Sequence, residues 1–227
     1  MKQKTKPISA SLPLAHVDKD TLQERVFRQL SNLILDGEIA PGQLVTIQSL
    51  ADSLGVSAMP VREALKRLTA ANALTVVYGR SIGIPPLTVD RLKDLRNVRI
   101  EIEGLATEWA VDHFTPVGIA VLDEQYEKMK EAIAAKNAKG FLRSNRAFHF
   151  EIYRTAGSPV ALRIIENLWL QISPYFSLLH ESGNPKTANK HHAVMIKAIR
   201  KRDKAAARAA SRADIDSAYK VLLTLLS

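Results

Sequence analysis

The sequence predicts a mainly α-helical protein that carries one small β-hairpin. Apolar residues recur at helical spacing through most of its 227 residues, and branched residues gather on both sides of a glycine turn near residue 79. Pro85 and Pro86 oppose both helix and strand pairing, so they predict a boundary between two domains. We therefore expect a flexible tail over residues 1–18, a first domain over 19–84, a linker over 85–88 and a second domain over 89–227.

Composition is that of a globular protein, with 46% hydrophobic residues and a formal net charge of +9. The positive excess lies mostly after residue 185 and favours an anionic partner without identifying it. The absence of cysteine excludes disulfides and thiolate metal sites. No apolar run approaches a membrane span, and Pro13 interrupts the short segment after the basic N-terminus, which therefore does not form a signal peptide. We expect a cytoplasmic protein that binds no membrane.

Two short helices joined by a tight turn are predicted between Thr46 and Leu74. Thr46 can cap the first helix, whose apolar face consists of Ile47, Leu50, Ala51 and Leu54. Gly55 breaks this helix and Ser57 can cap the second one, whose first turn tolerates Pro60 because no backbone donor is needed there. This is the helix-turn-helix arrangement, in which the second helix enters the major groove of DNA.

The second of these helices has one apolar face and one polar face. Its inward residues are Val61, Ala64, Leu65 and Leu68, and its exposed residues are Ala58, Met59, Arg62, Lys66 and Arg67. Arg62 can donate two hydrogen bonds to a guanine edge or a phosphate, while Lys66 and Arg67 supply charge to the DNA backbone. The alternative is an ordinary helical pair with a solvated basic face.

Further elements flank the helix-turn-helix. A helix is predicted over residues 22–35, where an Asp-Gly pair ends it, and the apolar segment 43–45 is expected only to lead into the next helix. Residues 74–78 and 82–84 are expected to form a hairpin, the wing. Arg80 at its tip can reach a minor groove or a phosphate, with a purely structural hairpin as the alternative.

Beyond residue 88, glycine and proline fall mainly between long periodic runs. These runs predict helices over residues 89–113, 116–136, 138–156, 159–182, 187–200 and 203–226. Six consecutive helices of this length predict an antiparallel bundle.

Three polar residues of this bundle stand where apolar residues belong. His149, with Asn145 one turn before it, shares its helical face with apolar residues, as do His192 and Asp214 on later helices. A carboxylate on an apolar face is costly unless it is paired, protonated or bound to a cation. We therefore expect the three helices to bring these groups together in a pocket.

Two stretches, DGEIAPGQL and LADSLGVSAMPVREALKRLTAANAL, resemble the winged helix-turn-helix of GntR-family transcription regulators. A later stretch, VRIEIEGLATEWA, is similar to the opening helix of the all-helical, FCD-type effector domain in the FadR-like subfamily. The resemblance covers about residues 20–220. It implies a homodimer that binds double-stranded, palindromic operator DNA through its winged helix-turn-helix and responds to a small organic acid in its helical domain.

The resemblance also implies roles for particular DNA-facing residues. Ser57 matches a hydroxyl residue that contacts phosphate in the family, and Arg62 matches its DNA-contacting arginine. The chain departs from the family at Ala58 and Met59, where Arg-Thr is usual, and at Gln48, where arginine is frequent. The operator sequence of other members is therefore not transferable.

In the helical domain, Arg99 and Glu103 match positions that often face the ligand cavity in the family. Their alternative role is an intrahelical ion pair worth about 0.3–0.5 kcal/mol. The family's metal-binding positions are occupied here by Asn145, His149, His192 and Asp214. Asparagine replaces an aspartate and aspartate replaces a histidine, so a divalent metal ion is an open question and zinc is not assumed.

Two other classes of protein are alternatives. In a metal-dependent hydrolase, two histidines and an aspartate would hold the metal with an open coordination position. No activated nucleophile, phosphate loop or acid–base pair accompanies them here, so we expect no enzyme. A non-specific architectural DNA-binding protein is opposed by the large, nearly neutral helical domain, which charge neutralisation alone would not require.

Overall fold

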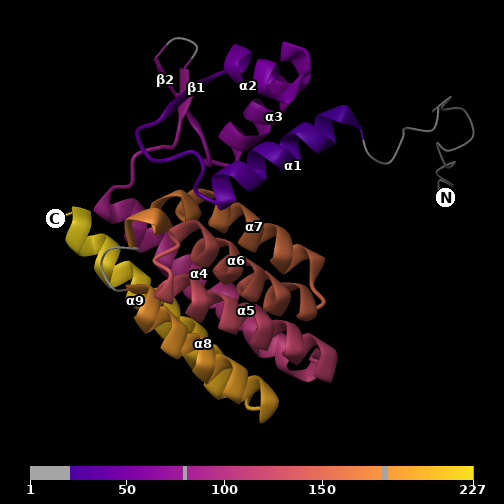
Figure 1. The fold of residues 1–227 in the computed structure, drawn as a ribbon, viewed down its shortest axis with the longest axis vertical. Coiled ribbons are helices and arrows are strands. Elements are labelled where there is room, and N and C mark those ends of the chain that lie inside the picture. Colours follow the sequence, from indigo (N-terminus) through magenta and orange to yellow (C-terminus); the bar gives the residue numbers. More distant parts are fainter. Residues whose placement is uncertain (1–20, 79–80, 180–183, 227) are drawn as a thin grey trace, which may run out of the picture.

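The computed structural model describes residues 21–78, 81–179 and 184–226, and its mainly α-helical fold is the predicted one. The first half contains α1 (Leu22–Leu35), β1 (Leu44–Thr46), α2 (Ile47–Leu54), α3 (Ala58–Ala70), β2 (Thr75–Tyr78) and β3 (Ser81–Gly83). The second half contains α4 (Val89–His113), α5 (Pro116–Ala134), α6 (Ala138–Thr155), α7 (Pro159–Ile172), the 3₁₀ helix η2 (Ser173–Leu179), α8 (Asn184–Arg200) and α9 (Lys204–Leu226). Figure 1 shows the first half on one side of the helical bundle. The expected tail over residues 1–18 lies outside the described residues.

Helices α2 and α3 form the predicted helix-turn-helix. The Thr46 and Ser49 side chains each accept a hydrogen bond from the other residue's backbone N–H, at 3.1 Å, which makes a capping box at the start of α2. Gly55 ends α2 with φ 63°, the left-handed conformation that glycine adopts without strain. The residues of α3 that we expected to face inward are all buried: Val61, Ala64, Leu65 and Leu68.

The capping role that we expected for Ser57 is wrong. Ser57 occupies the N-cap position of α3 with an extended backbone, but its side chain makes no capping hydrogen bond. The residue is exposed, so water can solvate the first N–H groups of α3 in its place. The Ser57 hydroxyl therefore remains available to another acceptor or donor.

The wing is a three-stranded antiparallel sheet rather than the isolated hairpin that we expected. Its strand order is β1-β3-β2, and β1 pairs with β3 through Leu44 opposite Gly83 and Val45 opposite Ile82. A two-stranded hairpin is only marginally stable in water, and the third strand adds hydrogen bonds and an apolar face. The segment expected only to lead into α2 is thus part of the sheet. Arg80 lies outside the described residues.

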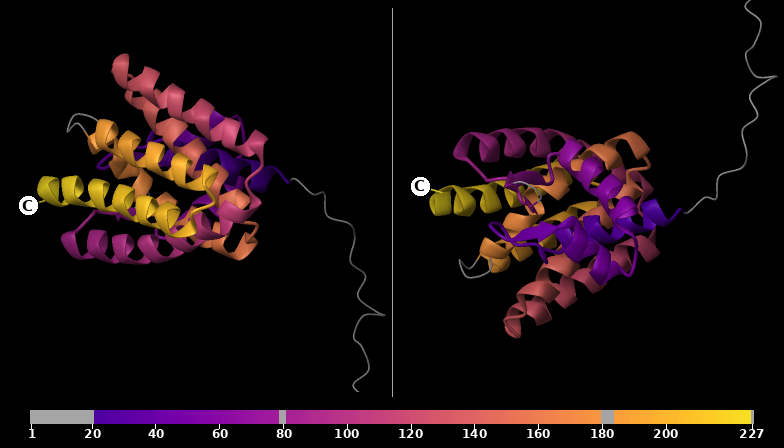
Figure 2. Two further views of the ribbon diagram at one scale, coloured as in Figure 1. Left: turned by 90° about the horizontal axis from the view of Figure 1, so that it is seen from below. Right: turned by 90° about the horizontal axis from the view of Figure 1, so that it is seen from above.

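Helices α4 to α9 form the predicted bundle. Helix α9 packs along both α4 and α8, and α5 packs along α6 (Figures 1 and 2). The observed bounds of α4, α5, α6 and α9 agree with the predicted ranges to within two residues, and α8 begins three residues earlier than predicted. Among the described helices, none is long and apolar enough to cross a membrane.

The single helix predicted over residues 159–182 is wrong. Helix α7 ends at Ile172, and η2 continues the chain from Ser173. Pro174 has no backbone N–H and its ring clashes with the preceding turn, so the α-helix cannot continue through it. The Ser173 backbone N–H and hydroxyl both donate to the Trp169 carbonyl at this helix end, the hydroxyl at 2.6 Å.

The two halves touch through polar contacts as well as packing. Arg146 of α6 donates to Asp36 at 2.9 Å and to Asn32 at 2.8 Å, at the C-terminal end of α1. Arg91 of α4 donates to the carbonyls of Pro85 and Pro86 at 3.3 and 3.2 Å and to the Asn72 carbonyl at 3.0 Å, and the Tyr175 hydroxyl of η2 donates to the Pro85 carbonyl. The segment between β3 and α4, which contains no helix or strand, is therefore held from both sides.

Candidate functional site

A hollow in the first half lies where the helix-turn-helix meets the sheet. Its lining consists of Thr46, Ile47, Gln48, Ala58, Arg62, Val76 and Ile82. The hollow therefore brings together three of the predicted DNA-facing residues, Gln48, Ala58 and Arg62. Met59 stands beside them at the exposed end of α3, with 62% of its surface accessible. An arginine among small and apolar side chains at a helix N-terminus can offer both hydrogen bonds and methyl contacts to base edges.

The other predicted DNA-facing side chains have partners within the protein. Lys66 forms an exposed ion pair with Glu63 at 2.8 Å. Arg67 pairs with Glu24 of α1 at 2.8 Å, and its guanidinium lies 3.6 Å from the centre of the Phe27 ring. Gln48 donates to Asp52, one turn further along α2, at 2.8 Å. Arg67 is thus directed toward α1, whereas Arg62 is exposed on α3.

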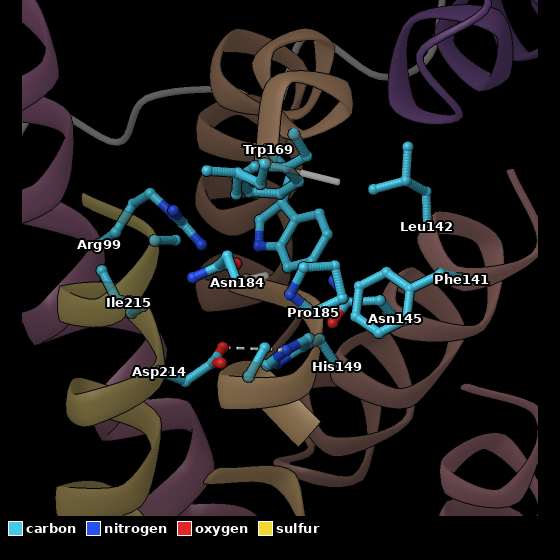
Figure 3. A pocket seen from close by; sticks show the side chains of 14 residues that line it. Arg99, Phe141, Leu142, Asn145, His149, Trp169, Asn184, Pro185, Asp214 and Ile215 are labelled. Carbon is cyan, nitrogen blue, oxygen red and sulfur yellow. Dashed lines mark ion pairs between the residues drawn. The ribbon is translucent and has the colours of Figure 1, made fainter. Parts of the chain in front are cut away.

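The second site is a small pocket of about 40 Å³ within the helical bundle (Figure 3). Its polar lining residues are Arg99, Asn145, His149, Trp169, Asn184 and Asp214, and the rest of its lining is apolar. His192 lies directly behind His149, with the two Nε2 atoms 3.2 Å apart. Helices α6, α8 and α9 therefore bring the three polar interruptions of the sequence to one place, and Asn145 lines the same pocket.

Hydrogen-bond partners on the far side of each histidine ring favour a proton on Nδ1. The Tyr153 hydroxyl donates to Glu103 at 2.6 Å, so its oxygen is free to accept from Nδ1–H of His149 at 3.3 Å. The Asn189 side-chain oxygen, which can only accept, lies 3.2 Å from Nδ1 of His192. In these tautomers both imidazoles direct an unprotonated Nε2 toward the same point, as metal ligands do; with Nε2 protonated instead, either ring can donate to Asp214.

Asp214 completes a cluster of three acceptors. Its carboxylate lies 3.3 Å from Nε2 of His149 and 3.7 Å from Nε2 of His192. All three donor atoms lie within 4.8 Å of one another. Acceptors that face each other repel, so the cluster favours a positive charge at its centre, either a metal ion or a proton on one Nε2. Ligand atoms on a tetrahedral ion with bonds of about 2.0–2.2 Å stand roughly 3.3–3.6 Å apart. The two Nε2 atoms are close to this separation at 3.2 Å, whereas the distances of 3.3 and 3.7 Å join them to different oxygens of Asp214, Oδ2 and Oδ1.

Asp214 is ionised in the cluster. Burial alone would raise the pKa of Asp214, but His192 and His149 hold this pKa well below its usual range whenever their Nε2 atoms carry a proton and donate to the carboxylate. Burial lowers the pKa of His192, and the nearby Asp214 carboxylate offsets this only in part. A neutral imidazole and an ionised carboxylate are the forms in which these residues bind metal. Asn189 and Tyr153, which hold the far side of each ring, serve as the outer hydrogen-bond partners that metal-binding histidines need.

Arg99 and Glu103 form a buried pair rather than an exposed one. Nε and Nη2 of Arg99 donate to the two Glu103 oxygens at 2.5 and 3.2 Å. Burial lowers the pKa of Arg99, but the neighbouring Glu103 carboxylate has the larger effect, so the pKa of Arg99 is raised. Burial and the Glu103 carboxylate both raise the pKa of Tyr153, which lies well above its ordinary value. Arg99 lines the pocket, whereas Glu103 is fully buried and does not line it. Glu103 therefore positions Arg99 and Tyr153 from behind.

Four residues of the site escaped the sequence analysis: Trp169 and Asn184 line the pocket, and Tyr153 and Asn189 contact His149 and His192 from behind. Tyr153 stands four residues after His149, and Asn189 stands three residues before His192, so helical spacing could have indicated both. Trp169 gave no signal, because one more aromatic residue on an apolar helix is indistinguishable from core.

Comparison with known families assigns both halves of the chain. Residues 22–84 match the family described as bacterial regulatory proteins, gntR family, and residues 94–217 match the FCD domain. The HTH-type transcriptional regulator McbR of Escherichia coli (strain K12) is 31% identical over 187 residues, which cover 81% of this chain and 85% of that protein.

Solved structures give the same result. The structure of E. coli McbR/YncC aligns with a TM-score of 0.80 and 28% identity over 91% of this chain and 97% of that one. A putative GntR regulator from Rhodococcus sp. RHA1 aligns with a TM-score of 0.71 and 19% identity over 88% of this chain and 97% of that one, a likeness of fold alone.

These relatives are named as transcriptional regulators, and the comparisons support neither the hydrolase nor the architectural alternative. The helix-turn-helix, the wing and the helical bundle stand in the order that both family matches require. The chain therefore belongs to the GntR family of bacterial regulatory proteins, and it is a transcription regulator with a DNA-binding helix-turn-helix and an FCD domain.

Proposed function

We propose that the protein binds a palindromic operator as a homodimer and that a small organic acid, held with a divalent metal ion in the α6–α8–α9 pocket, changes its operator affinity. The observation that carries the proposal is the convergence of His149, His192 and Asp214, three acceptors facing one point in an otherwise apolar pocket. A metal ion there would complete its shell with a ligand oxygen, and its positive charge would favour a carboxylate. Asn145, in the same pocket, is the proposed fourth contact.

The remaining charges of the pocket agree with an acidic ligand. The charge of Arg99 is balanced by Glu103, so Asp214 and the metal ion determine the net charge of the site. A divalent cation with one carboxylate leaves the site positive, whereas the site without metal is negative and would repel an acid. The metal ion is therefore what makes this pocket select an organic acid.

The DNA proposal rests on Arg62, Gln48 and Ala58, which share the hollow beside the wing. It rests also on two exposed residues, Ser57 at the N-cap of α3 and Met59 in its first turn. We propose that Lys66 and Arg67 leave their present ion-pair partners, Glu63 and Glu24, and contact DNA phosphates instead. The proposed DNA contact of Arg80 rests on the sequence alone. One recognition helix reads too few base pairs for useful specificity, so a two-fold symmetric dimer doubles the site.

Arg62→Ala is expected to weaken binding to an operator selected with the wild-type protein by about 1–3 kcal/mol and to relax the preference at one base pair of each half-site. Lys66→Ala is the matched control on the same helix. It should weaken binding equally for all sequences and reduce the salt dependence, because it would contact phosphate. Selection of operators from random DNA, followed by binding assays and footprinting, measures both. An operator bound equally well by Arg62→Ala removes this residue from the site, and a single unrepeated half-site contradicts the dimer.

Helix α6 offers a direct route from the pocket to the DNA-binding half. Phe141, Leu142 and Asn145 line the pocket, while the next residue, Arg146, bonds to the end of α1 through Asp36 and Asn32. Lys139 of the same helix pairs with Glu38 at 2.7 Å. A shift of α6 on ligand binding would therefore move the contacts that hold α1, which packs against α3.

Arg146→Ala is expected to reduce the coupling between acid binding and DNA binding by about 0.5–2 kcal/mol, with little change in acid affinity. The measurement is the ratio of operator Kd values with and without a saturating carboxylic acid found by thermal-shift screening. Arg154→Ala on the same helix is the control, since Arg154 is exposed and its contacts, an ion pair with Glu151 and the ring of Phe150, lie within α6. Equal coupling in wild type and Arg146→Ala would show that the signal does not pass through this contact.

A further inference from the structure

The indole nitrogen of Trp169 has no hydrogen-bond partner within the described residues. Among the described residues it is the one buried side-chain nitrogen without a partner, and the side chain is only 2% exposed. Most buried donors in proteins are paired, because an unpaired N–H loses its bonds to water and gains nothing in return. An unpaired donor in a ligand pocket therefore indicates a partner that arrives with the ligand.

The position of the ring supports this reading. Trp169 lines the pocket, and Figure 3 shows its nitrogen on the side of the ring that faces Asn184 and the end of Arg99 in that view. Edge-to-face contacts with Phe150 and Phe176, at centroid distances of 5.2 and 5.6 Å, hold the indole in place. The donor is thus fixed in direction, as a specificity contact requires.

The indole lies within reach of a small ligand bound at the acceptor cluster. The centroids of the Trp169 and His149 rings are 5.4 Å apart. On the other side, the Arg99 guanidinium carbon lies 5.6 Å from the Trp169 ring centre. Arg99 gives Nε and Nη2 to Glu103, and within the described residues its Nη1 donates no hydrogen bond, so it offers a second donor nearby.

We propose that Trp169 Nε1–H donates to a second oxygen of the effector, so that the effector is a small oxo-, hydroxy- or dicarboxylic acid rather than an unsubstituted fatty acid. This inference rests on the proposed function, since the first carboxylate is the one held at the metal. The remaining pocket wall, with Phe141, Leu179 and Ile215, is apolar and contacts the carbon chain. A pocket built to bond an oxygen discriminates against the analogue that lacks it, because its own donor is then left unpaired.

The chain contains two tryptophans, Trp109 and Trp169, which makes a direct test possible. In Trp109→Phe the indole N–H of Trp169 gives the single tryptophan side-chain signal in a ¹⁵N-correlated NMR spectrum. The full-length variant, loaded with Zn²⁺, is titrated with the matched probes butyrate and acetoacetate, propionate and lactate, and pentanoate and glutarate. We expect the oxygenated member of at least one pair to shift the indole proton downfield, as a new hydrogen bond does, and butyrate, propionate and pentanoate to leave it near its position in the free protein.

Calorimetry on Trp169→Phe completes the test. Phenylalanine keeps an aromatic ring and removes the N–H, so affinity for the oxygenated probe that shifts the indole signal should fall about tenfold. Affinity for its matched probe should change less than twofold. Trp109→Phe is the control for the substitution itself, and an unchanged metal content with cooperative thermal unfolding shows that the Trp169→Phe pocket is intact.

The outcomes separate this inference from the proposed function. Two outcomes would overturn the inference alone, because they would show that the Trp169 ring only fills space. In one, oxygenated acids bind tightly but do not shift the indole signal. In the other, the oxygenated acid and its matched probe lose the same affinity in Trp169→Phe. A protein that binds none of the six acids in the presence of metal contradicts the effector pocket and the inference together. A selective, indole-dependent preference for an oxygenated acid supports both.

Discussion

Replacing Glu103 by leucine is expected to lower the free energy of unfolding by about 3–5 kcal/mol. Glu103 is fully buried and accepts hydrogen bonds from Arg99 and Tyr153. Its removal leaves a guanidinium that cannot lose its charge, together with a phenol that has lost its acceptor. Chemical denaturation of the full-length protein measures the loss.

Glu101→Leu on the same helix is the matched control. Glu101 pairs with Arg208 at 2.9 Å but is mostly exposed, so its loss should cost no more than about 1 kcal/mol. The double variant Arg99→Met with Glu103→Leu should recover much of the stability, because no charge is then left unpaired. Similar losses for Glu101→Leu and Glu103→Leu would mean that the buried pair behaves like an exposed one.

The second large effect is expected from metal loading. A divalent ion bound by His149, His192 and Asp214 should stabilise the folded protein by about 4 kcal/mol when the free metal concentration is a thousand times Kd. His192→Ala should abolish this gain, since it removes one of two nitrogen ligands and leaves Asn189 without its partner. Thermal unfolding with added Zn²⁺ or Mn²⁺, beside elemental analysis of protein purified without an affinity tag, provides the measurement.

His191→Ala is the neighbouring control, because His191 lies on the same helix but outside the acceptor cluster. It should keep the full metal response. If wild type and His192→Ala respond equally to both metals, the cluster is not the binding site. If neither metal changes the unfolding of wild type and none is found by elemental analysis, the proposed metal-dependent effector site is refuted.

Local signals explain why much of the fold was predictable. Thr46 and Gly55 act through their own backbone and immediate neighbours, so the ends of α2 could be predicted from the sequence. Strand β1 could not, because its pairing with β3 joins segments nearly forty residues apart and its three residues carry no periodicity. The end of α7 at Ile172 was missed although Pro174 marks it, since the apolar period continues through the proline.

The candidate site divides in the same way. His149, His192 and Asp214 were predictable because a polar residue on an apolar helical face has a free-energy cost that something must offset. Trp169 was not, since an unpaired N–H becomes visible only when the neighbours of the indole are known. The partners of Arg67 could not be predicted either, because Glu24 and Phe27 belong to a different helix. The hydrophobic periodicity of a sequence predicts helices but does not give their relative positions.

The contacts between the two halves have a consequence for exchanging domains between relatives. Arg146, Arg91 and Tyr175 bond to groups in the DNA-binding half and its connecting segment, and Asp36 and Asn32 supply side chains rather than backbone atoms. A chimera joined at Pro85–Pro86 would keep the Tyr175 hydrogen bond, because any residue supplies the backbone carbonyl that it needs. It would lose the Arg146 hydrogen bonds unless the grafted half carried side-chain acceptors at the positions of Asn32 and Asp36. In engineered biosensors built from this chain, the transferable unit is therefore the FCD domain together with the end of α1.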